Sequence, residues 1–126
     1  IQGNSCYSYH KDATTDAPYK VDGYINLKVS GNTVTGTKRG TQAGPDMNNG
    51  YGGTLKGTLD KASMNLLFAY TIEGSKNSEK EIYNITPEGL EKIRYPLIDV
   101  KGVLTPDMTK EAKKMPYNKV DCSLIK

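Results

Sequence analysis

Three glutamates surround one short polar connection in the middle of the chain. Glu73 precedes it, and Glu79 and Glu81 follow it. Strands joined by so short a connection form a hairpin, so we expect these side chains to approach one another across it. Two nearby carboxyl groups could perform acid–base chemistry on a sugar. Glutamates beside lysines such as Lys76 and Lys80 are more often solvated charge pairs on a strand surface, and both interpretations stay open.

Other reactive residue types are sparse. His10 is the single histidine, and a metal site needs several ligands, so we expect a structural role for it. No serine stands in a G-x-S-x-G turn, and the glycines at 50–53 lack the lysine and helix of a phosphate loop. Basic residues are not interleaved with aromatic ones as in RNA-binding strands. We therefore expect no catalytic residues, no metal, no cofactor and no nucleic-acid partner.

Alternation of apolar and polar residues indicates strands through most of the chain. Leu66, Phe68, Tyr70 and Ile72 alternate onto one face, as in a strand packed against a core. Similar patterns predict strands over residues 6–10, 24–29, 33–39, 52–59, 64–72, 79–85, 90–94, 96–104 and 117–122. Thr105 followed by Pro106 is typical of a helix start, which predicts a short helical turn near 107–115.

Short connections favour antiparallel neighbours, so the simplest topology is an up-and-down meander. The prediction is an all-β fold: a small closed lipocalin-like barrel of eight or nine strands, with a two-sheet β-sandwich as the alternative. Nine tyrosines, one phenylalanine and no tryptophan suit a thin core. Residues 6–122 are expected to form one domain, with tails at 1–5 and 123–126.

The two cysteines lie near opposite ends of the chain. Both Cys6 and Cys122 fall in predicted terminal strands, and pairing of those strands would close a barrel and bring the thiols together. We predict a disulfide between them, the alternative being two unrelated buried thiols. A disulfide implies an oxidising compartment.

Short motifs along most of the chain occur together in one group of bacterial proteins. They are Cys6-Tyr7-Ser8-Tyr9, GNTVTG at 31–36, the glycine-rich residues 49–57, FAYTIEG at 68–74, Glu81, and Val120-Asp121-Cys122. The pattern resembles small lipoproteins of uncharacterised function from Bacteroidetes-type bacteria, although Lys80 stands where an arginine is expected. The resemblance implies an exported β-domain whose only membrane attachment is a lipid on a cysteine preceding residue 1. This group carries no catalytic assignment that the resemblance could transfer.

These observations favour a non-enzymatic, exported β-barrel that binds a small ligand, as a monomer in the periplasm, at the cell surface or secreted. Polar groups near the most apolar hairpin are the candidate ligand contacts: Tyr70, Glu73, Glu81, Tyr83 and Arg94. One alternative is a protein-partner module such as a periplasmic inhibitor of lysozyme or another hydrolase. The net charge of +3 argues against this alternative because such hydrolases are usually cationic. The other alternative is a glycan-active enzyme using the glutamate pair.

Overall fold

A computed structural model describes residues 1–45, 48–72 and 74–124. Its strands are β1 (Gly3–Lys11), β2 (Lys20–Ser30), β3 (Thr33–Ala43), β4 (Asn48–Asp60), β5 (Ser63–Ile72), β6 (Ser75–Thr86), β7 (Gly89–Arg94), β8 (Leu97–Val100), β9 (Val103–Pro106) and β10 (Lys113–Val120). One 3-10 turn, η1 (Cys122–Leu124), follows β10. No helix in the described part of the chain is long and apolar enough to span a membrane.

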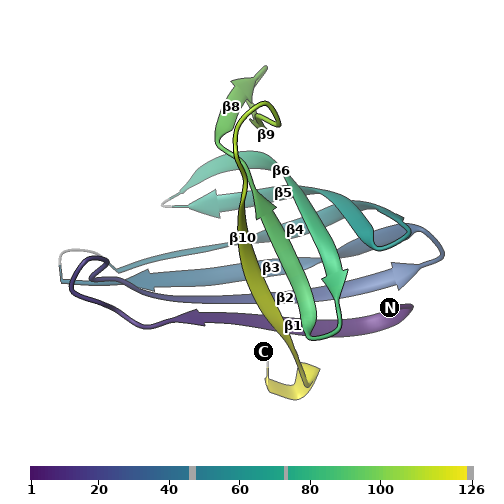
Figure 1. Cartoon of the computed structure of the whole chain (residues 1–126), viewed down its shortest axis with the longest axis horizontal. Coiled ribbons are helices and arrows are strands. Elements are labelled where there is room, and N and C mark those ends of the chain that lie inside the picture. The colour runs from purple at the N-terminus through teal and green to yellow at the C-terminus, as the bar shows by residue number, and fades with distance from the viewer. Residues whose placement is uncertain (46–47, 73, 125–126) are drawn as a thin grey trace.

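Eight of the strands close into an antiparallel barrel (Figure 1). Strands β1 to β7 follow one another around the wall, β5 pairs with β6, and β10 lies between β7 and β1. The closed meander predicted from the short connections is therefore confirmed, and the two-sheet sandwich is not formed. Closure also leaves the eight wall strands without a free sheet edge.

The disulfide between Cys6 and Cys122 is present, and it lies where the first and last strands of the barrel wall meet. Cys6 lies in β1, which pairs with β10 through only three residue pairs, the first being Cys6 with Val120. Cys122 follows in η1, so the covalent bond lies beside this short ladder. The predicted pairing of the terminal strands is thus confirmed. β1 already begins at Gly3, inside the predicted tail, and residues 125–126 of the other tail lie outside the described residues.

Strands β8 and β9 form a hairpin that projects from the barrel between β7 and β10 (Figure 1). The prediction of one strand over 96–104 is therefore wrong. Lys101 and Gly102 both have positive φ, of 52° and 86°, and they turn the chain in the middle of that segment. The Asp99 carboxylate accepts a hydrogen bond of 2.8 Å from the Gly102 N–H and secures the turn.

The predicted helical turn near 107–115 is also wrong. The Asp107 carboxylate accepts hydrogen bonds from the Thr109 N–H and hydroxyl, at 3.1 and 2.6 Å, so it stabilises a local turn. From Lys113 onward the chain is already strand β10, paired with β7. A helix this short is marginal by itself, and the ladder with β7 provides more hydrogen bonds than one helical turn could.

The interior of the barrel has an apolar end and a charged end. Val29 pairs with Val34 and Leu59 with Met64, each next to a tight turn, and these residues fill the end where β2–β3 and β4–β5 turn. Inward positions nearer the opposite end carry charge instead, beginning with Lys38 on β3 and Glu81 on β6. The barrel is therefore packed with apolar side chains at one end and has a polar mouth at the other.

Candidate functional site

The most unusual feature of the interior is a buried charge cluster, made of Lys38, Glu79, Glu81, Tyr83 and Lys92. The Lys38 ammonium donates to both oxygens of Glu81, at 3.0 and 2.8 Å, and to the Tyr83 hydroxyl at 2.9 Å. The Tyr83 hydroxyl donates to Glu81 at 2.6 Å. The Lys92 ammonium lies 2.8 Å from Glu81 and 3.1 Å from Glu79. The side chains of Lys38 and Glu81 are only 4% and 1% exposed.

Strand register places these groups together. Tyr83 on β6 is opposite Lys92 on β7, so both point inward at the same height. Glu81 and Glu79 follow at alternate positions of β6, and successive alternate residues of a strand share one face. Lys38 reaches the cluster from β3 on the other side of the interior, and its ammonium lies 4.9 Å from the ring centroid of Phe68.

The cluster is ionic at neutral pH. Burial opposes the ionisation of Glu81, but the ammonium groups of Lys38 and Lys92 outweigh it and lower the pKa of this carboxyl to about 2. Burial lowers the pKa of Lys38 to about 8, and the attraction of Glu81 limits the fall. Glu79 differs: burial and its contact with Glu81 raise its pKa. The two neighbouring carboxyl groups therefore titrate in different ranges.

A cavity of about 330 Å³ lies between this cluster and the mouth of the barrel. We call it the mouth cavity; it is lined by Tyr9, Lys11, Val21, Lys38, Gln42, Tyr51, Lys92, Arg94, Met115 and Tyr117. Two of its tyrosines lie over glycines: Tyr51 over Gly40 of the adjacent strand β3, and Tyr117 over Gly23 of β2, where any side chain would meet the ring. The rings of Tyr9 and Tyr117 pack with centroids 5.7 Å apart. The wall is thus aromatic, and the floor is charged.

The residues predicted as ligand contacts are distributed as follows. Glu81 and Tyr83 are hydrogen-bonded to each other in the charge cluster, and Arg94 lines the mouth cavity. Tyr70 is half-buried and stacks on Phe68, with ring centroids 4.6 Å apart, and it does not line the cavity. Glu73 lies outside the described residues. Glu79 and Glu81 do come together, but as buried partners of Lys92 rather than as solvated partners of surface lysines.

The sequence interpretation missed Lys38 and Lys92. Neither is among the residues predicted from the sequence, although each occupies the apolar phase of its strand. Lys38 follows Val34 and Gly36 at alternate positions of β3, and Lys92 follows Leu90 in β7. A lysine at an inward position of a predicted strand was therefore the available signal for this site.

His10 lies at the rim, away from the mouth cavity. Its Nδ1 and Nε2 lie 2.6 Å from carboxylate oxygens of Asp22 and Asp12, respectively. Only the doubly protonated ring can donate to both carboxylates, so the hydrogen bonds to Asp22 and then Asp12 raise the pKa of His10 above 6.5. Within the described residues, no group of three or more His, Cys, Asp and Glu side chains is arranged to hold a metal.

This raised pKa gives a direct test of the rim geometry. Because His10 is the only histidine, its ring protons give one resolved NMR titration curve. We expect its midpoint above 6.5 in the native protein and a lower midpoint in Asp22→Asn, which removes the negative charge facing Nδ1. Asp60→Asn, at the β4–β5 turn, is the matched control and should leave the midpoint unchanged. A native midpoint at or below 6.5 would contradict the contacts of His10 with Asp22 and Asp12.

Together, the fold and this interior describe a small closed β-barrel with a packed apolar end and a charged, tyrosine-lined mouth. Comparison with known proteins adds no relative: no protein family, no curated protein and no solved structure matches the chain.

Proposed function

We propose that this protein is a binding protein for a small molecule with an anionic group and an aromatic or other flat apolar body, held in the mouth cavity. The charge of the cavity carries this proposal. Four cationic side chains, Lys11, Lys38, Lys92 and Arg94, face two carboxylates, Glu79 and Glu81. The excess of positive charge favours an anion, and tyrosine rings offer stacking surfaces to its apolar body.

The charge cluster supports binding at the mouth by holding cationic groups in place. Lys92 is held by two carboxylates, so its ammonium cannot move far from the cavity floor. Arg94 lies one inward position closer to the mouth, exposed, and its side chain makes no hydrogen bond or ion pair among the described residues. A free guanidinium above a fixed ammonium suits a carboxylate or phosphate, which can accept from both.

Binding explains the glutamate pair better than glycan hydrolysis does. A glycosidase needs room for the sugar, and often for a water molecule, between its two carboxyl groups. Here Glu79 and Glu81 bind the same Lys92 ammonium. The pocket on the β7 side of these residues measures about 110 Å³, room for a few water molecules. We therefore propose a role without catalysis.

The disulfide supports a location outside the cytoplasm, because structural disulfides form and persist in oxidising compartments. We propose that the domain acts in the periplasm, at the cell surface or in the surrounding medium. Attachment to a membrane would then come from a lipid on a preceding cysteine, as in the lipoproteins that the sequence motifs resemble.

A protein-partner role is the second candidate, and the projecting hairpin favours it. Leu97, Ile98 and Val100 of β8 are 42%, 49% and 45% exposed. Apolar side chains on a projecting element often insert into a cleft of another protein. The hairpin would therefore be the contacting element of an inhibitor.

The mouth-cavity proposal is tested with benzoate and its uncharged counterpart benzamide, by isothermal titration calorimetry at low salt. We expect benzoate to bind more tightly, and Arg94→Gln to weaken benzoate binding about tenfold, as for loss of one charge-assisted hydrogen bond. The matched control is Arg39→Gln, whose guanidinium lies on the outside of the barrel over the Tyr24 ring. Equal affinity for benzoate and benzamide, or equal loss in both variants, would contradict the proposal.

A further inference from the structure

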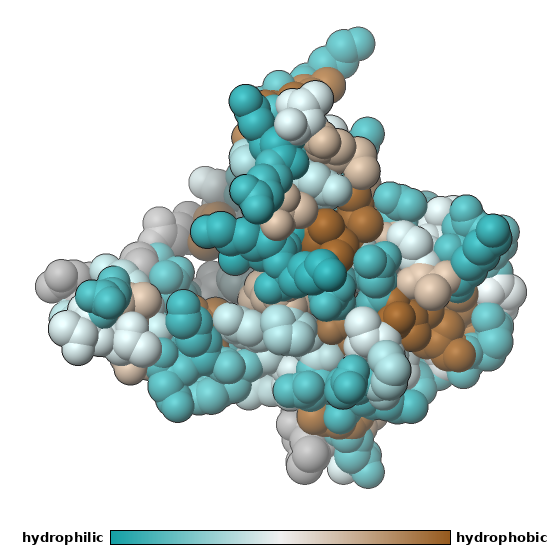
Figure 2. Space-filling model, viewed as in Figure 1, coloured by the Kyte–Doolittle hydropathy of each residue, from teal (hydrophilic) through white to brown (hydrophobic). Residues whose placement is uncertain are grey.

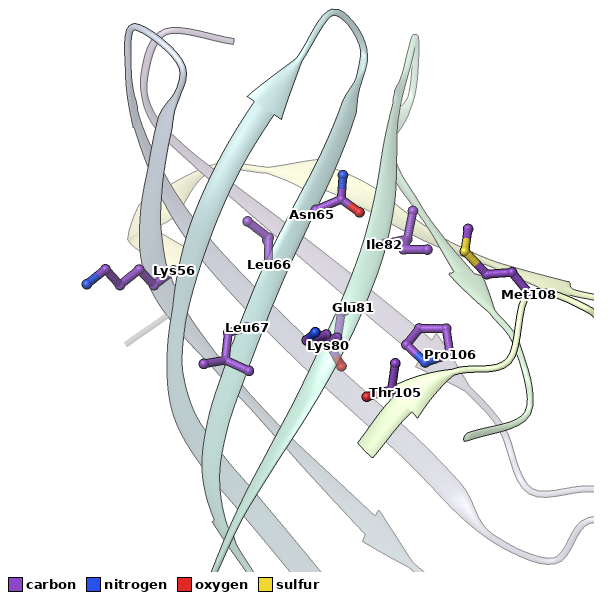
Figure 3. Close-up of a pocket in the computed structure, with 10 residues that line it drawn as sticks. All are labelled: Lys56, Asn65, Leu66, Leu67, Lys80, Glu81, Ile82, Thr105, Pro106 and Met108. Carbon is purple, nitrogen blue, oxygen red and sulfur yellow. The ribbon is translucent and has the colours of Figure 1, made fainter. Parts of the chain in front are cut away.

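A second hollow lies on the outside of the barrel, where the hairpin segment approaches the wall. It measures about 490 Å³ and runs between the outer face of β4–β6 and residues 105–108 after the hairpin turn (Figure 3). We call it the outer groove; it is lined by Lys56, Asn65, Leu66, Leu67, Lys80, Glu81, Ile82, Thr105, Pro106 and Met108. Strands β5 and β6 separate this groove from the mouth cavity, so the two sites are distinct.

The surface of the outer groove is mainly apolar. Leu67 is 41% exposed and Met108 is 65% exposed, and Ile82 and Pro106 lie between them as half-buried side chains. Hydrophobic surface is also visible where the hairpin joins the barrel (Figure 2). Apolar side chains left exposed around a concave surface are typical of a ligand-binding groove.

The groove suits a hydrocarbon chain better than a peptide. The strands that form its floor are paired on both sides along this stretch, Leu67 with Lys56 on β4 and with Lys80 on β6. Their backbone N–H and C=O groups are therefore already hydrogen-bonded and cannot pair with an added strand. A peptide backbone lying here would lose hydrogen bonds to water without replacing them, whereas an alkyl chain has none to lose.

The charges around the groove select an anionic head group. Lys56 and Lys80 are both exposed at its surface. Glu81 is the one acidic residue among those that line it, and its carboxylate points into the barrel, where it binds Lys38. Nearby Asp107 is turned toward Thr109, from whose hydroxyl it accepts a hydrogen bond of 2.6 Å. The groove thus combines an apolar floor with two exposed lysines at its surface.

We propose that the outer groove binds a free, single-chain amphiphile with a carboxylate head, such as a medium-chain fatty acid. The chain lies on Leu67, Ile82, Pro106 and Met108, and the carboxylate is held by Lys80. Because the groove is separate from the mouth cavity, this proposal does not depend on the ligand proposed for the mouth.

The test uses decanoate below its micellar concentration, titrated into the whole protein and followed by calorimetry. We expect decanoate to bind and its uncharged counterpart decanamide to bind more weakly. Leu67→Asp should weaken decanoate binding at least about tenfold, and Lys80→Glu about fivefold, as charge reversal at an exposed site allows. Both residues are exposed, so neither change threatens folding.

Two control variants separate the groove from its surroundings. Ile98→Asp places the same charge on an exposed apolar residue of the hairpin outside the groove, and Lys28→Glu reverses a charge on the outside of β2. Both should bind decanoate as the native protein does. Equal loss in test and control variants, or affinity for decanamide equal to that for decanoate, would overturn the proposal.

Two further outcomes would overturn the proposal, because they would assign the fatty acid to another site or the groove to another ligand. Loss of decanoate binding in Arg94→Gln, with Leu67→Asp unaffected, would place the fatty acid in the mouth cavity. Binding to vesicles of phosphatidylcholine with phosphatidylglycerol, without binding of monomeric decanoate, would assign the groove to a membrane surface.

Discussion

Glu81→Gln is expected to lower the free energy of unfolding at pH 7 by about 3–5 kcal/mol, the cost of breaking a buried ion pair from one side. The substitution keeps the shape of the side chain and removes its charge. Lys38 then remains inside the barrel without its carboxylate, and Lys92 keeps only Glu79. Urea unfolding followed by tyrosine fluorescence measures the loss. Glu91→Gln, which loses only a contact of 3.8 Å between a partly exposed carboxylate and the exposed Lys114, should cost less than about 1 kcal/mol.

The pH dependence of this loss identifies its cause. The Glu81 carboxyl has a pKa of about 2 in the folded protein and about 4.5 in the unfolded chain, so its contribution is complete above 4.5 and disappears as the pH falls toward 2. Burial lowers the pKa of Lys38 from 10.5 to about 8, and loss of Glu81 lowers it further. In the variant, the pKa of Lys38 is lower in the folded state than in the unfolded chain. Raising the pH therefore increases the free energy of unfolding of the variant. The difference between native and variant should therefore be largest above pH 4.5 and below the lowered pKa of Lys38 in the variant, and shrink on both sides of this range; a constant difference would contradict a charge effect.

A triple replacement separates the stability of the cluster from its function. Lys38→Met, Glu81→Leu and Tyr83→Phe together remove the buried pair and the hydroxyl bonded to it, and leave Lys92 with Glu79. Apolar replacement of a whole buried ion pair is often neutral or stabilising. If this variant is as stable as the native protein but binds benzoate more weakly, the cluster serves ligand binding rather than stability.

Much of the barrel could be predicted from sequence because its strands alternate clearly. Residues 24–29, for example, lie within β2, and the turn at Gly31 joins it to β3 as expected. The hairpin at 97–106 was missed because Leu97 to Leu104 is apolar enough for one strand, and the turn depends on Lys101 at positive φ. A single local conformation, not a composition pattern, decides that feature.

The candidate site was predicted in part for a related reason. Glu81, Tyr83 and Arg94 were chosen for their polar groups near an apolar hairpin, and the structure places them in or beside the mouth cavity. Lys38 was missed because its partner, Glu81, is 43 residues away in sequence. Lysine is rarely buried unless it is paired, so its burial could only be inferred once the register across the barrel was known.

Loss of the disulfide is expected to be about as costly as loss of Glu81. In the loop-entropy account, a bridge between residues 116 apart stabilises the fold by about 4–5 kcal/mol, mainly by restricting the unfolded chain. The folded state adds a second reason. β1 and β10 share only three residue pairs, whereas β2 and β3 share eleven. The bridge therefore secures a short ladder, the one that joins the first and last strands of the barrel wall.

Three variants test this prediction: Cys6→Ala, Cys122→Ala and the double replacement. Because either single change breaks the same bond, each should lower the free energy of unfolding by nearly the same amount as the double change, and by nearly the same amount as reduction of the native protein. Additive losses would mean that the side chains contribute by separate packing rather than through the bond.

Hydrogen exchange locates the effect of the bridge within the barrel. If the bridge holds the β1–β10 ladder closed, amides of residues 118–120 should lose protection in the double variant more than those of β3 and β4, because opening at this ladder exposes the interior without unfolding the rest of the wall.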